Sequence, residues 1–537
     1  MNNKKRSNLS HEQIKKTPIG ASSKHSFMSK LPPLPGYLIC FISLWIFAST
    51  IYDDMFYMSE QYSMFAFDKL LMEHTLNLPF GWLIVCGRLM LLTFHYPVLG
   101  GLILSLILTL IVWIINYLFN LKGIKSIFPI ILPFAFLSYL ISKGINLYYQ
   151  QEPSITFIIP GIALLIVSIL ALLKRVISRK PIRKWYWIDK EEAKVTTWLQ
   201  CITPIILTCL ITIAGFHFVQ NDILTARLQR LMQQQQWDEM IKTALKAKQP
   251  SRSIAAYYAI ALLQTNQLNE RLFEINYQYP DMNLVNQGGI PDDGTDLYAA
   301  DCDFTTGLVQ TSYHHAMERM VVDGPSCHTL KRLYLCSLLN NETALAQKYL
   351  SILKRIPFQD DFLSKYGPML TNRKLIAEDA ELRQILDMQP IQDSFEQQYQ
   401  KPVFLGYNMA LSSGKSQRAL QASIAACLYA KQLTAAIVRT QPLIGNSLPN
   451  AIEQAVVMES YKNPRLKEAF PISPITSSTV DGFLRTCSSL PSKDPLVNAE
   501  LLKDTYKNFY PYYYYFENIP DETQIKKYEN AQKGGVN

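Results

Sequence analysis

The sequence predicts an all-α protein in two parts, an N-terminal helical transmembrane bundle of about five spans and a C-terminal α-helical, repeat-like soluble domain. The first 219 of the 537 residues contain several long apolar stretches. The rest consists of short amphipathic helical patterns separated by polar turns, and alternating strand patterns are scarce. A mean hydropathy of +0.03 with 18% charged residues excludes a disordered chain.

Five stretches are long and apolar enough to cross a hydrocarbon core, which takes about 17–25 helical residues. They cover approximately residues 36–52, 96–119, 124–147, 154–173 and 197–219. A sixth stretch, 78–95, contains Arg88 and is followed at once by Pro97. We interpret it as an interfacial or re-entrant helix whose arginine reaches lipid headgroups or protein.

The distribution of lysine and arginine gives the orientation. The tail 1–35 and the connector 174–194 are strongly basic, which predicts that both are cytoplasmic. Five spans across residues 36–219 satisfy this and place residues 220–537 outside the cytoplasm. The predicted setting is a bacterial inner (plasma) membrane, with a cytoplasmic N-terminus and a periplasmic C-terminal domain.

The net charge of +9 divides into +10 for residues 1–219 and −1 for the remainder. A nucleic-acid-binding domain would concentrate basic residues on a polar globular face. The charge therefore indicates membrane topology, and the lipid bilayer rather than nucleic acid is the expected partner.

The second part contains recurring pairs of amphipathic helices. Trp237 and Leu268 begin comparable second helices 31 residues apart, and small residues such as Ala255 and Ala259 follow in the helix between them. This spacing and the small residues resemble tetratricopeptide repeats, over about 220–280, 325–360 and 415–465. The resemblance implies stacked helix pairs; an irregular α-helical domain is the alternative.

Two intervals interrupt this pattern, and the chain then ends in an aromatic run. Residues 280–304 carry an aspartate cluster without calcium-loop spacing and are expected to form a solvated loop. Residues 464–495 are proline- and serine-rich and are also expected to be a loop. The run Tyr512–Phe516 is expected to cap the last helix against the rest of the domain.

Nine cysteines divide into four in apolar segments and five in the second part. Either Cys302 and Cys327 form a disulfide in an oxidising compartment, or both are free buried thiols. His314, His315 and His328 lie near this pair, but zinc-ligand spacing is absent. Phosphate-loop and hydrolase motifs are also absent, so the sequence predicts no metal site and no cofactor.

One feature supports an enzyme hypothesis. Asp53 and Asp54 directly follow the first span, in an acidic segment that includes Glu60. Polytopic glycosyltransferases of the type C fold are similar in placing a carboxylate in their first outer loop. The resemblance implies Asp53 or Asp54 as a general base or metal ligand, with Arg88 near a lipid phosphate. The alternative is an acidic outer loop without catalytic function.

The layout as a whole resembles uncharacterised bacterial multi-pass membrane proteins with a tetratricopeptide-like outer domain, notably in the acidic segment 57–61 and the aromatic C-terminus. This resemblance implies no established activity. The leading hypothesis is a membrane-anchored, non-enzymatic scaffold that presents helical repeats to a periplasmic protein or peptide. The competing hypothesis is a glycosyltransferase-like enzyme that acts on a lipid-linked substrate at the outer membrane face.

Overall fold

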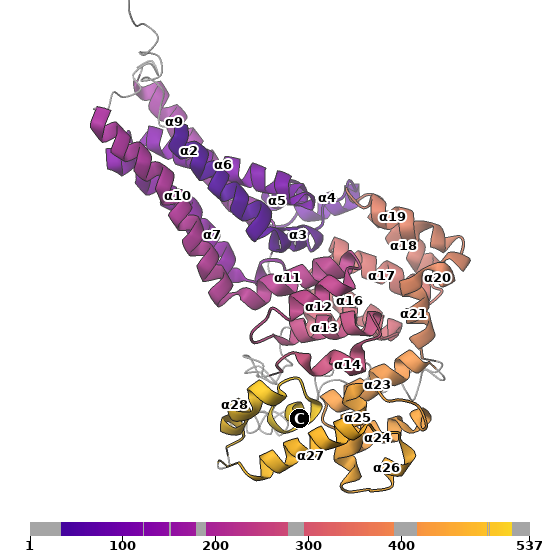
Figure 1. Ribbon diagram of the computed structural model, residues 1–537. Helices are drawn as coiled ribbons and strands as arrows, with labels where there is room; N and C mark the ends of the chain where they lie inside the picture. The colour runs from indigo at the N-terminus through magenta and orange to yellow at the C-terminus, as the bar shows by residue number, and fades with distance from the viewer. Residues whose placement is uncertain are drawn as a thin grey trace, which may run out of the picture.

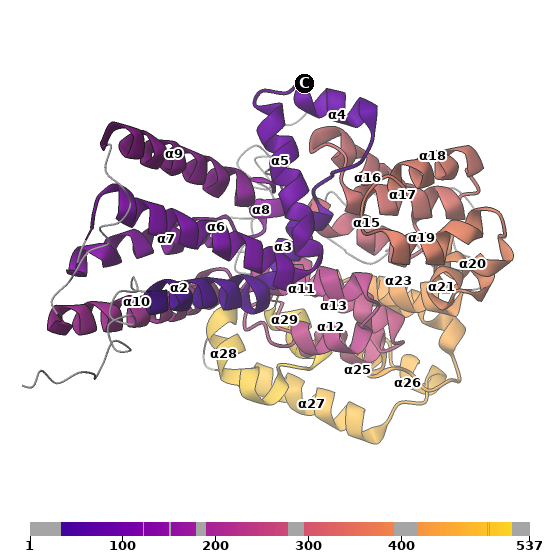
Figure 2. The same cartoon turned by 90° about the horizontal axis from the view of Figure 1, so that it is seen from above.

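A computed structural model of the chain contains helices and turns but no strands among its described residues. The described residues are 34–121, 123–149, 152–178, 190–277, 295–390, 416–490, 492 and 494–517. An elongated bundle of apolar helices projects from one side of a larger helical domain (Figures 1 and 2). We refer to residues 34–218 as the apolar bundle, to residues 220–517 as the helical domain and to their contact region as the junction. The predicted tail up to residue 33 lies outside the described residues.

The apolar bundle contains five long helical segments and several short ones. The long segments are α2 with its π-helical end η1, α6, η3 with α7, α9 and α10. The bounds are α2 Leu34–Ile46, η1 Phe47–Ile51, α3 Asp53–Gln61, α4 Lys69–Leu76, α5 Gly81–Leu91, η2 Leu92–His95, α6 Pro97–Leu118, η3 Gly123–Ile130, α7 Ile131–Lys143, α8 Asn146–Tyr149, α9 Ile155–Ser178 and α10 Lys190–Phe218.

Four helices are long and apolar enough to cross a membrane: Pro97–Leu118, Gly123–Lys143, Ile155–Ile177 and Val195–Phe218. A fifth candidate is the pair Pro35–Ile51 and Asp53–Gln61, which is bent by 66°. The four helices overlap the last four predicted stretches, the first predicted stretch, 36–52, forms part of the bent pair, and the apolar surface of these segments indicates membrane association.

The predicted interfacial segment 78–95 forms only a short apolar helix, Gly81–His95. At a rise of about 1.5 Å per residue, this helix is too short to cross a hydrocarbon core of about 30 Å. Large apolar side chains on and before it are exposed, among them Leu70, Phe80 and Trp82. An exposed aromatic and aliphatic face is typical of a helix that lies in the membrane interface.

The five long segments run between the same two ends of the bundle. At the end far from the helical domain, Asn116 Nδ2 donates to the Tyr37 hydroxyl at 2.8 Å, and Gln200 Nε2 donates to Ser126 Oγ at 2.6 Å. Lys174 Nζ donates to main-chain oxygens at the C-terminus of α6. The beginnings of α2, η3 and α10 therefore meet the last turns of α6 and α9.

α6 lies in the middle of the bundle, where it packs against α2, η1 and α9. A Cβ added at Gly101 would lie 3.1–3.2 Å from atoms of Ser49, so this glycine lets α6 approach η1 closely. By contrast, α9 and α10 expose most of their apolar surface around the outside of the bundle.

The helical domain follows directly from α10. Its helices are α11 Gln220–Gln233, α12 Trp237–Ala244, α13 Arg252–Gln264, α14 Leu268–Arg271, η4 Leu272–Glu274, α15 Thr295–Thr305, α16 Val309–Val322, α17 Cys327–Leu339, α18 Thr343–Leu353, α19 Asp360–Tyr366, η5 Gly367–Leu370, α20 Lys374–Glu378, α21 Ala380–Met388, α23 Gln417–Tyr429, α24 Leu433–Arg439, η6 Gln441–Leu443, α25 Asn450–Ser460, α26 Leu466–Ala469, α27 Pro474–Ser488, α28 Pro495–Tyr506 and α29 Tyr510–Phe516.

Four helix pairs in this domain are joined by one kind of turn in which the left-handed residue is not glycine. The pairs are α11/α12, α13/α14, α17/α18 and α23/α24, and each turn has one left-handed residue: Gln235, Asn266, Asn341 and Lys431, with φ of 56–63°. In each turn the following N–H bonds to the carbonyl five residues earlier, at 2.9–3.0 Å. This is the Schellman arrangement that ends helices, here repeated as the link between two helices.

The aromatic C-terminus is buried, as predicted. Tyr510 and Tyr513 of α29 belong to the main core of the helical domain, and Tyr512 and Phe516 pack in a smaller cluster with α27 and α28. The Tyr513 hydroxyl bonds to the Tyr429 carbonyl. The short helix α29 therefore caps the last part of the domain.

Two predicted loops prove to be partly helical. Residues 295–305 form α15, which buries Asp301 and Asp303, whereas Asp292 and Asp293 lie outside the described residues. Residues 474–488 form α27, which begins at a proline in its first turn and buries Val480 and Phe483. The first loop prediction failed because the buried Asp301 finds a charged partner in Arg332, and the second because proline also suits the first turn of a helix.

Candidate functional site

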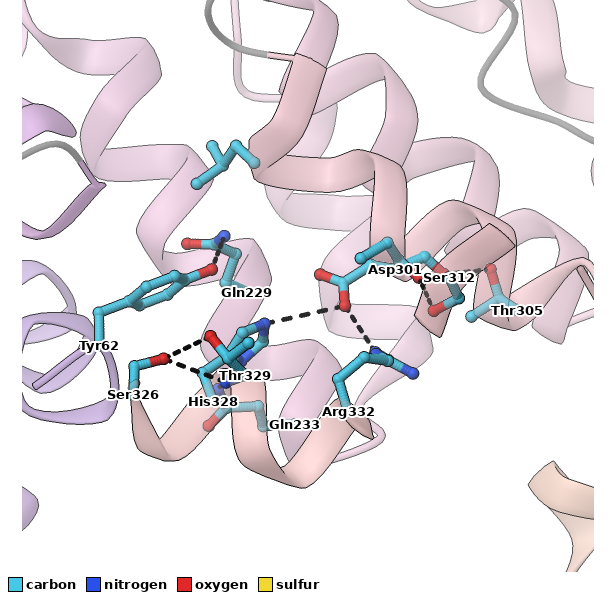
Figure 3. A network of polar contacts seen from close by, with 12 residues as sticks. Tyr62, Gln229, Gln233, Asp301, Thr305, Ser312, Ser326, His328, Thr329 and Arg332 are labelled. Atoms are coloured by element: carbon cyan, nitrogen blue, oxygen red, sulfur yellow. Dashed lines mark hydrogen bonds and ion pairs between the residues drawn. The ribbon is translucent and has the colours of Figure 1, made fainter. Parts of the chain in front are cut away.

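Polar and charged side chains from both parts of the chain meet at the junction. They come from α3 and the loop after it, from α5 and α8 of the bundle, and from α11, α13, α15, α16 and α17 of the helical domain. Figure 3 shows the part of this region around α17, where Tyr62 points from the bundle side toward helical-domain residues. The predicted site residues Asp53, Asp54, Glu60 and Arg88 all border the junction.

The adjacent carboxylates Asp53 and Asp54 form ion pairs across the junction. They begin α3, and Nη1 of Arg230 on α11 lies 2.8 Å from Asp53 Oδ2 and 2.9 Å from Asp54 Oδ1. The Arg230 guanidinium also lies over the Tyr57 ring at 4.7 Å, and Arg227 is 3.7 Å from Asp54. Both carboxylates therefore hold the helical domain against the bundle.

Glu60 and Arg88 also have protein partners. Glu60 is buried, accepts a hydrogen bond from Gln61 Nε2 at 2.6 Å and lies 3.8 Å from His95 Nδ1. Arg88 of α5 donates through Nε and Nη2 to the two carboxylate oxygens of Glu152, at 3.0 and 2.6 Å. Of the two alternatives predicted for Arg88, lipid headgroups or protein, the structure shows contact with protein.

A continuous chain of buried hydrogen bonds crosses from the bundle into the helical domain. The Tyr148 hydroxyl donates to Gln229 Oε1 at 2.8 Å, and Gln229 Nε2 donates to the Tyr257 hydroxyl at 3.0 Å. The Tyr257 hydroxyl donates to Asp301 Oδ2 at 3.0 Å, and Arg332 Nη2 pairs with Asp301 Oδ1 at 2.5 Å. We refer to these five residues as the junction network; each satisfies a buried polar group of its neighbour.

His328 on α17 lies beside this network. Its ring stacks on Tyr62 with 4.8 Å between centroids, Nδ1 is 3.4 Å from Gln233 Nε2, and Nε2 is 3.9 Å from Asp301 (Figure 3). Burial lowers the pKa of His328 to about 4, although Asp301 opposes this shift. The imidazole is therefore neutral at neutral pH.

A cavity of about 290 Å³, which we call the junction cavity, opens between the two parts of the chain. A second cavity of about 20 Å³, with room for roughly one water, adjoins it and is lined by Asp301, His328 and Arg332. The two cavities share Tyr62, Arg319 and Thr329. The junction cavity is lined by Tyr62, Ser63, Arg88, Tyr148, Tyr149, Glu152, Pro153, Arg319, Val322, Asp323, Gly324, Pro325, Ser326 and Thr329.

The two cysteines proposed as a pair are not joined. Cys302 and Cys327 are free buried thiols that belong to different hydrophobic clusters, one around α13 and one around α17 and α18. Burial raises the pKa of both thiols, that of Cys327 to about 11, so neither is an activated nucleophile. Among the described residues, no group of three or more histidine, cysteine or acidic side chains is arranged to hold a metal ion.

Tyr62, Gln229, Arg319 and Arg332 are not singled out by sequence reasoning, and Asp301 is considered only as part of the aspartate cluster of residues 280–304. They are spread over five segments that only the fold brings together. The available signal was local: Arg332 lies between Leu330 and Leu333 on a helix that is otherwise largely apolar. A charge on the buried face of a helix requires a buried partner, and here that partner is Asp301.

Most carboxylates of this region are paired with arginines, whereas Glu60 accepts a hydrogen bond from Gln61. The fold and the junction define an all-helical, membrane-associated protein whose two parts share a polar interface. The chain belongs to a family of unknown function, DUF6057, which matches residues 30–167 and 141–517. No curated protein and no solved structure matches the chain.

Proposed function

We propose that this protein is a membrane-anchored scaffold that holds a domain of helical repeats in a fixed orientation at the membrane surface. The observation that carries the proposal is the continuity of the hydrophobic cores across the junction. Met64 and Ala66 of the bundle belong to the core of α16–α21, and Ile223, Ala226 and Leu297 of the helical domain belong to the core of the bundle. Such interpenetration opposes hinge motion, because opening would expose both cores.

Polar contacts around the same interface support a fixed orientation. The Ile145 N–H donates to Asp222 Oδ2 at 3.0 Å, and the Phe67 N–H donates to the Arg355 carbonyl at 3.0 Å. Together with the ion pairs of Arg230, these contacts attach α11 and the turn after α18 to the end of the bundle. A domain held in this way would present its surface at a constant height and angle.

The helical-repeat assignment rests on the four helix pairs with the same Schellman-type turn. Repeated hairpins of this kind stack into surfaces that bind protein segments, as tetratricopeptide repeats do. The spacing between these turns is irregular after the first two, which indicates degenerate repeats with insertions. We infer that the partner is an extracytoplasmic protein or peptide.

The proposed orientation places the helical domain in the bacterial periplasm and the N-terminus in the cytoplasm. It is supported by the described elements that meet at the far end of the bundle: the start of α2 follows the basic tail in the sequence, η3 contains Lys125, and the ends of α9 and α10 flank the basic connector. Cations concentrate on the cytoplasmic side of bacterial inner-membrane proteins.

The alternative function, a glycosyltransferase-like enzyme acting on a lipid-linked substrate, rests on Asp53 and Asp54. Their ion pairs with Arg230 give both carboxylates a structural role that requires no reaction. A general base must reach the proton it removes, and here each carboxylate already faces an arginine. The geometry therefore favours the scaffold.

Site-specific photo-cross-linking in intact cells tests the scaffold. A photoreactive residue at Val438 of α24 would probe the helices farthest from the bundle (Figure 1), and one at Leu172 of α9 is the membrane control. We expect one discrete protein adduct at Val438, and its loss when the exposed Ile475 of α27 is changed to Glu but not to Val. Absence of an adduct from folded, membrane-inserted protein would contradict the proposal.

A further inference from the structure

The junction cavity contains hydrogen-bond donors that the protein does not use. Arg319 of α16 lines this cavity and the smaller one beside it, and only 9% of its side chain is exposed. Its Nη2 donates to the Tyr149 carbonyl at 3.0 Å, and its Nε lies 3.4 Å from Asp323. Its buried Nη1 and the buried hydroxyl of Ser63, also in the cavity wall, have no hydrogen-bond partner among the described residues.

The Arg319 guanidinium is held rigidly by its neighbours. It lies over the Tyr149 ring at 4.0 Å and over the Tyr62 ring at 4.9 Å. A planar cation fixed by aromatic rings loses little side-chain entropy when it binds a ligand, and its parallel N–H groups match the oxygens of a phosphate. An unpaired buried donor is costly, so a ligand that supplies an acceptor is favoured.

The rest of the wall also favours an anion. Helix α17 begins at Cys327, and Ser326 and Thr329 of its first turn line the cavity, so the positive end of the helix dipole lies there. The two acidic residues of the wall are already engaged. Glu152 pairs with Arg88, and Asp323 lies beside Arg319.

We propose that the junction cavity binds a phosphate-bearing anion through Arg319, with the Ser63 hydroxyl as a further donor and the positive end of the α17 dipole beside it. This binding goes beyond the scaffold function and does not depend on it. The cavity volume, near the lower end of ligand sites, suits a phosphate with a small attached group. The phosphate comes either from a lipid headgroup or from a soluble molecule. Two residues of the cavity wall, Glu152 and Pro153, directly precede the apolar helix α9. A third, Val322, is strongly exposed.

Ligand-induced stabilisation of the full-length protein in a neutral maltoside detergent tests this proposal. The probes are inorganic phosphate, phosphatidylglycerol in mixed micelles, diacylglycerol as a phosphate-free lipid, and chloride at matched ionic strength. We expect phosphate, phosphatidylglycerol or both to raise the unfolding temperature, and diacylglycerol and chloride not to do so. A response to phosphatidylglycerol alone identifies a lipid headgroup, and an equal response to inorganic phosphate identifies a soluble source.

Substitutions locate the binding site. Arg319→Gln should weaken phosphate binding about 10–100-fold, the effect expected for a charge-assisted contact, whereas Arg227→Gln, at the same junction but outside the cavity wall, should leave it unchanged. If Arg319→Gln does not fold, Ser63→Asp provides the test: its carboxylate would occupy the spare donors, keep the protein folded and abolish the response. Equal stabilisation of wild type and either cavity variant, or no stabilisation by any phosphate-bearing probe, would overturn the proposal.

Discussion

At the residue scale, His328 shows how burial sets the protonation state of a side chain in the junction. It is surrounded by Asp301, which favours the imidazolium, and by Arg332, Arg319 and Lys331, which oppose it. Desolvation is the largest influence, and it keeps the folded-state pKa near 4. The stacked Tyr62 ring and the Gln233 amide then pack against a neutral ring.

This lowered pKa predicts a specific acid sensitivity. Because the folded-state pKa lies below the unfolded value of about 6.5, His328 contributes stability above pH 6.5 that is lost as the pH falls toward 4. The full loss is roughly 3 kcal/mol in the free energy of unfolding, by about 1.4 kcal/mol per pKa unit. Denaturation of the detergent-solubilised protein at several pH values measures it.

The control for this prediction is a pair of substitutions. His328→Gln should remove the histidine-dependent part of the decline between pH 6.5 and 4, whereas His314→Gln, at an exposed position, should keep it. An unchanged pH profile in His328→Gln would show that other groups, such as the buried carboxylates, cause the acid sensitivity.

At the element scale, the turn between α15 and α16 joins the helices that carry Asp301 and Arg319, which both line the small cavity. Gly307 in this turn has φ of +85°, and an added Cβ would lie 2.6–2.7 Å from the main chain of Met388. Gly324, in the next turn, has φ of +87°, but an added Cβ would meet nothing within 4 Å. Substitutions at these two glycines therefore distinguish the cost of a left-handed backbone from the cost of steric overlap.

We expect Gly324→Ala to lower the free energy of unfolding by about 1 kcal/mol, the strain of a left-handed alanine. Gly307→Ala should cost at least twice as much, because the main chain at the end of α21 must also move. Chemical denaturation of both variants measures the difference. Equal effects would mean that α21 shifts without cost and that its position relative to α15 is not fixed.

Much of the helical layout follows from the sequence, because hydropathy and amphipathic period are local properties. The apolar segments 96–119 and 197–219 were placed within two residues of the helices found, and helix pairs were predicted around Trp237 and Leu268. The junction could not be predicted. Partners such as Tyr148 and Asp301 are more than 150 residues apart, and no local pattern indicates that a glutamine and a second tyrosine will join them.

At the scale of the whole molecule, the chain segments found at each end of the bundle predict the membrane topology. Leu121 and the start of α2 lie at the far end, whereas the helical domain lies at the other. A reporter that is active only outside the cytoplasm should therefore be active when fused after Asn537 and inactive when fused after Leu121. Activity in both fusions, or in neither, would be incompatible with five spans.

The ion pairs of Arg230 allow the structural role of Asp54 to be measured. If Asp54 and Arg230 act only as a structural pair, Asp54→Asn and Arg230→Gln should each lower stability by about 2 kcal/mol, given that their side chains are 11% and 22% exposed. The double variant should cost little more than either single one, since the interaction is lost once. Denaturation of the four proteins gives this coupling energy directly.

Function in cells completes the comparison. The scaffold predicts that any phenotype of Asp53→Asn, Asp54→Asn and Arg230→Gln follows the loss of folded protein, because all three residues serve the same contact between α3 and α11. A transferase would behave differently. An aspartate variant that keeps wild-type abundance and stability but loses the cellular function, while Arg230→Gln retains it, would identify the carboxylate as catalytic and exclude a purely structural role.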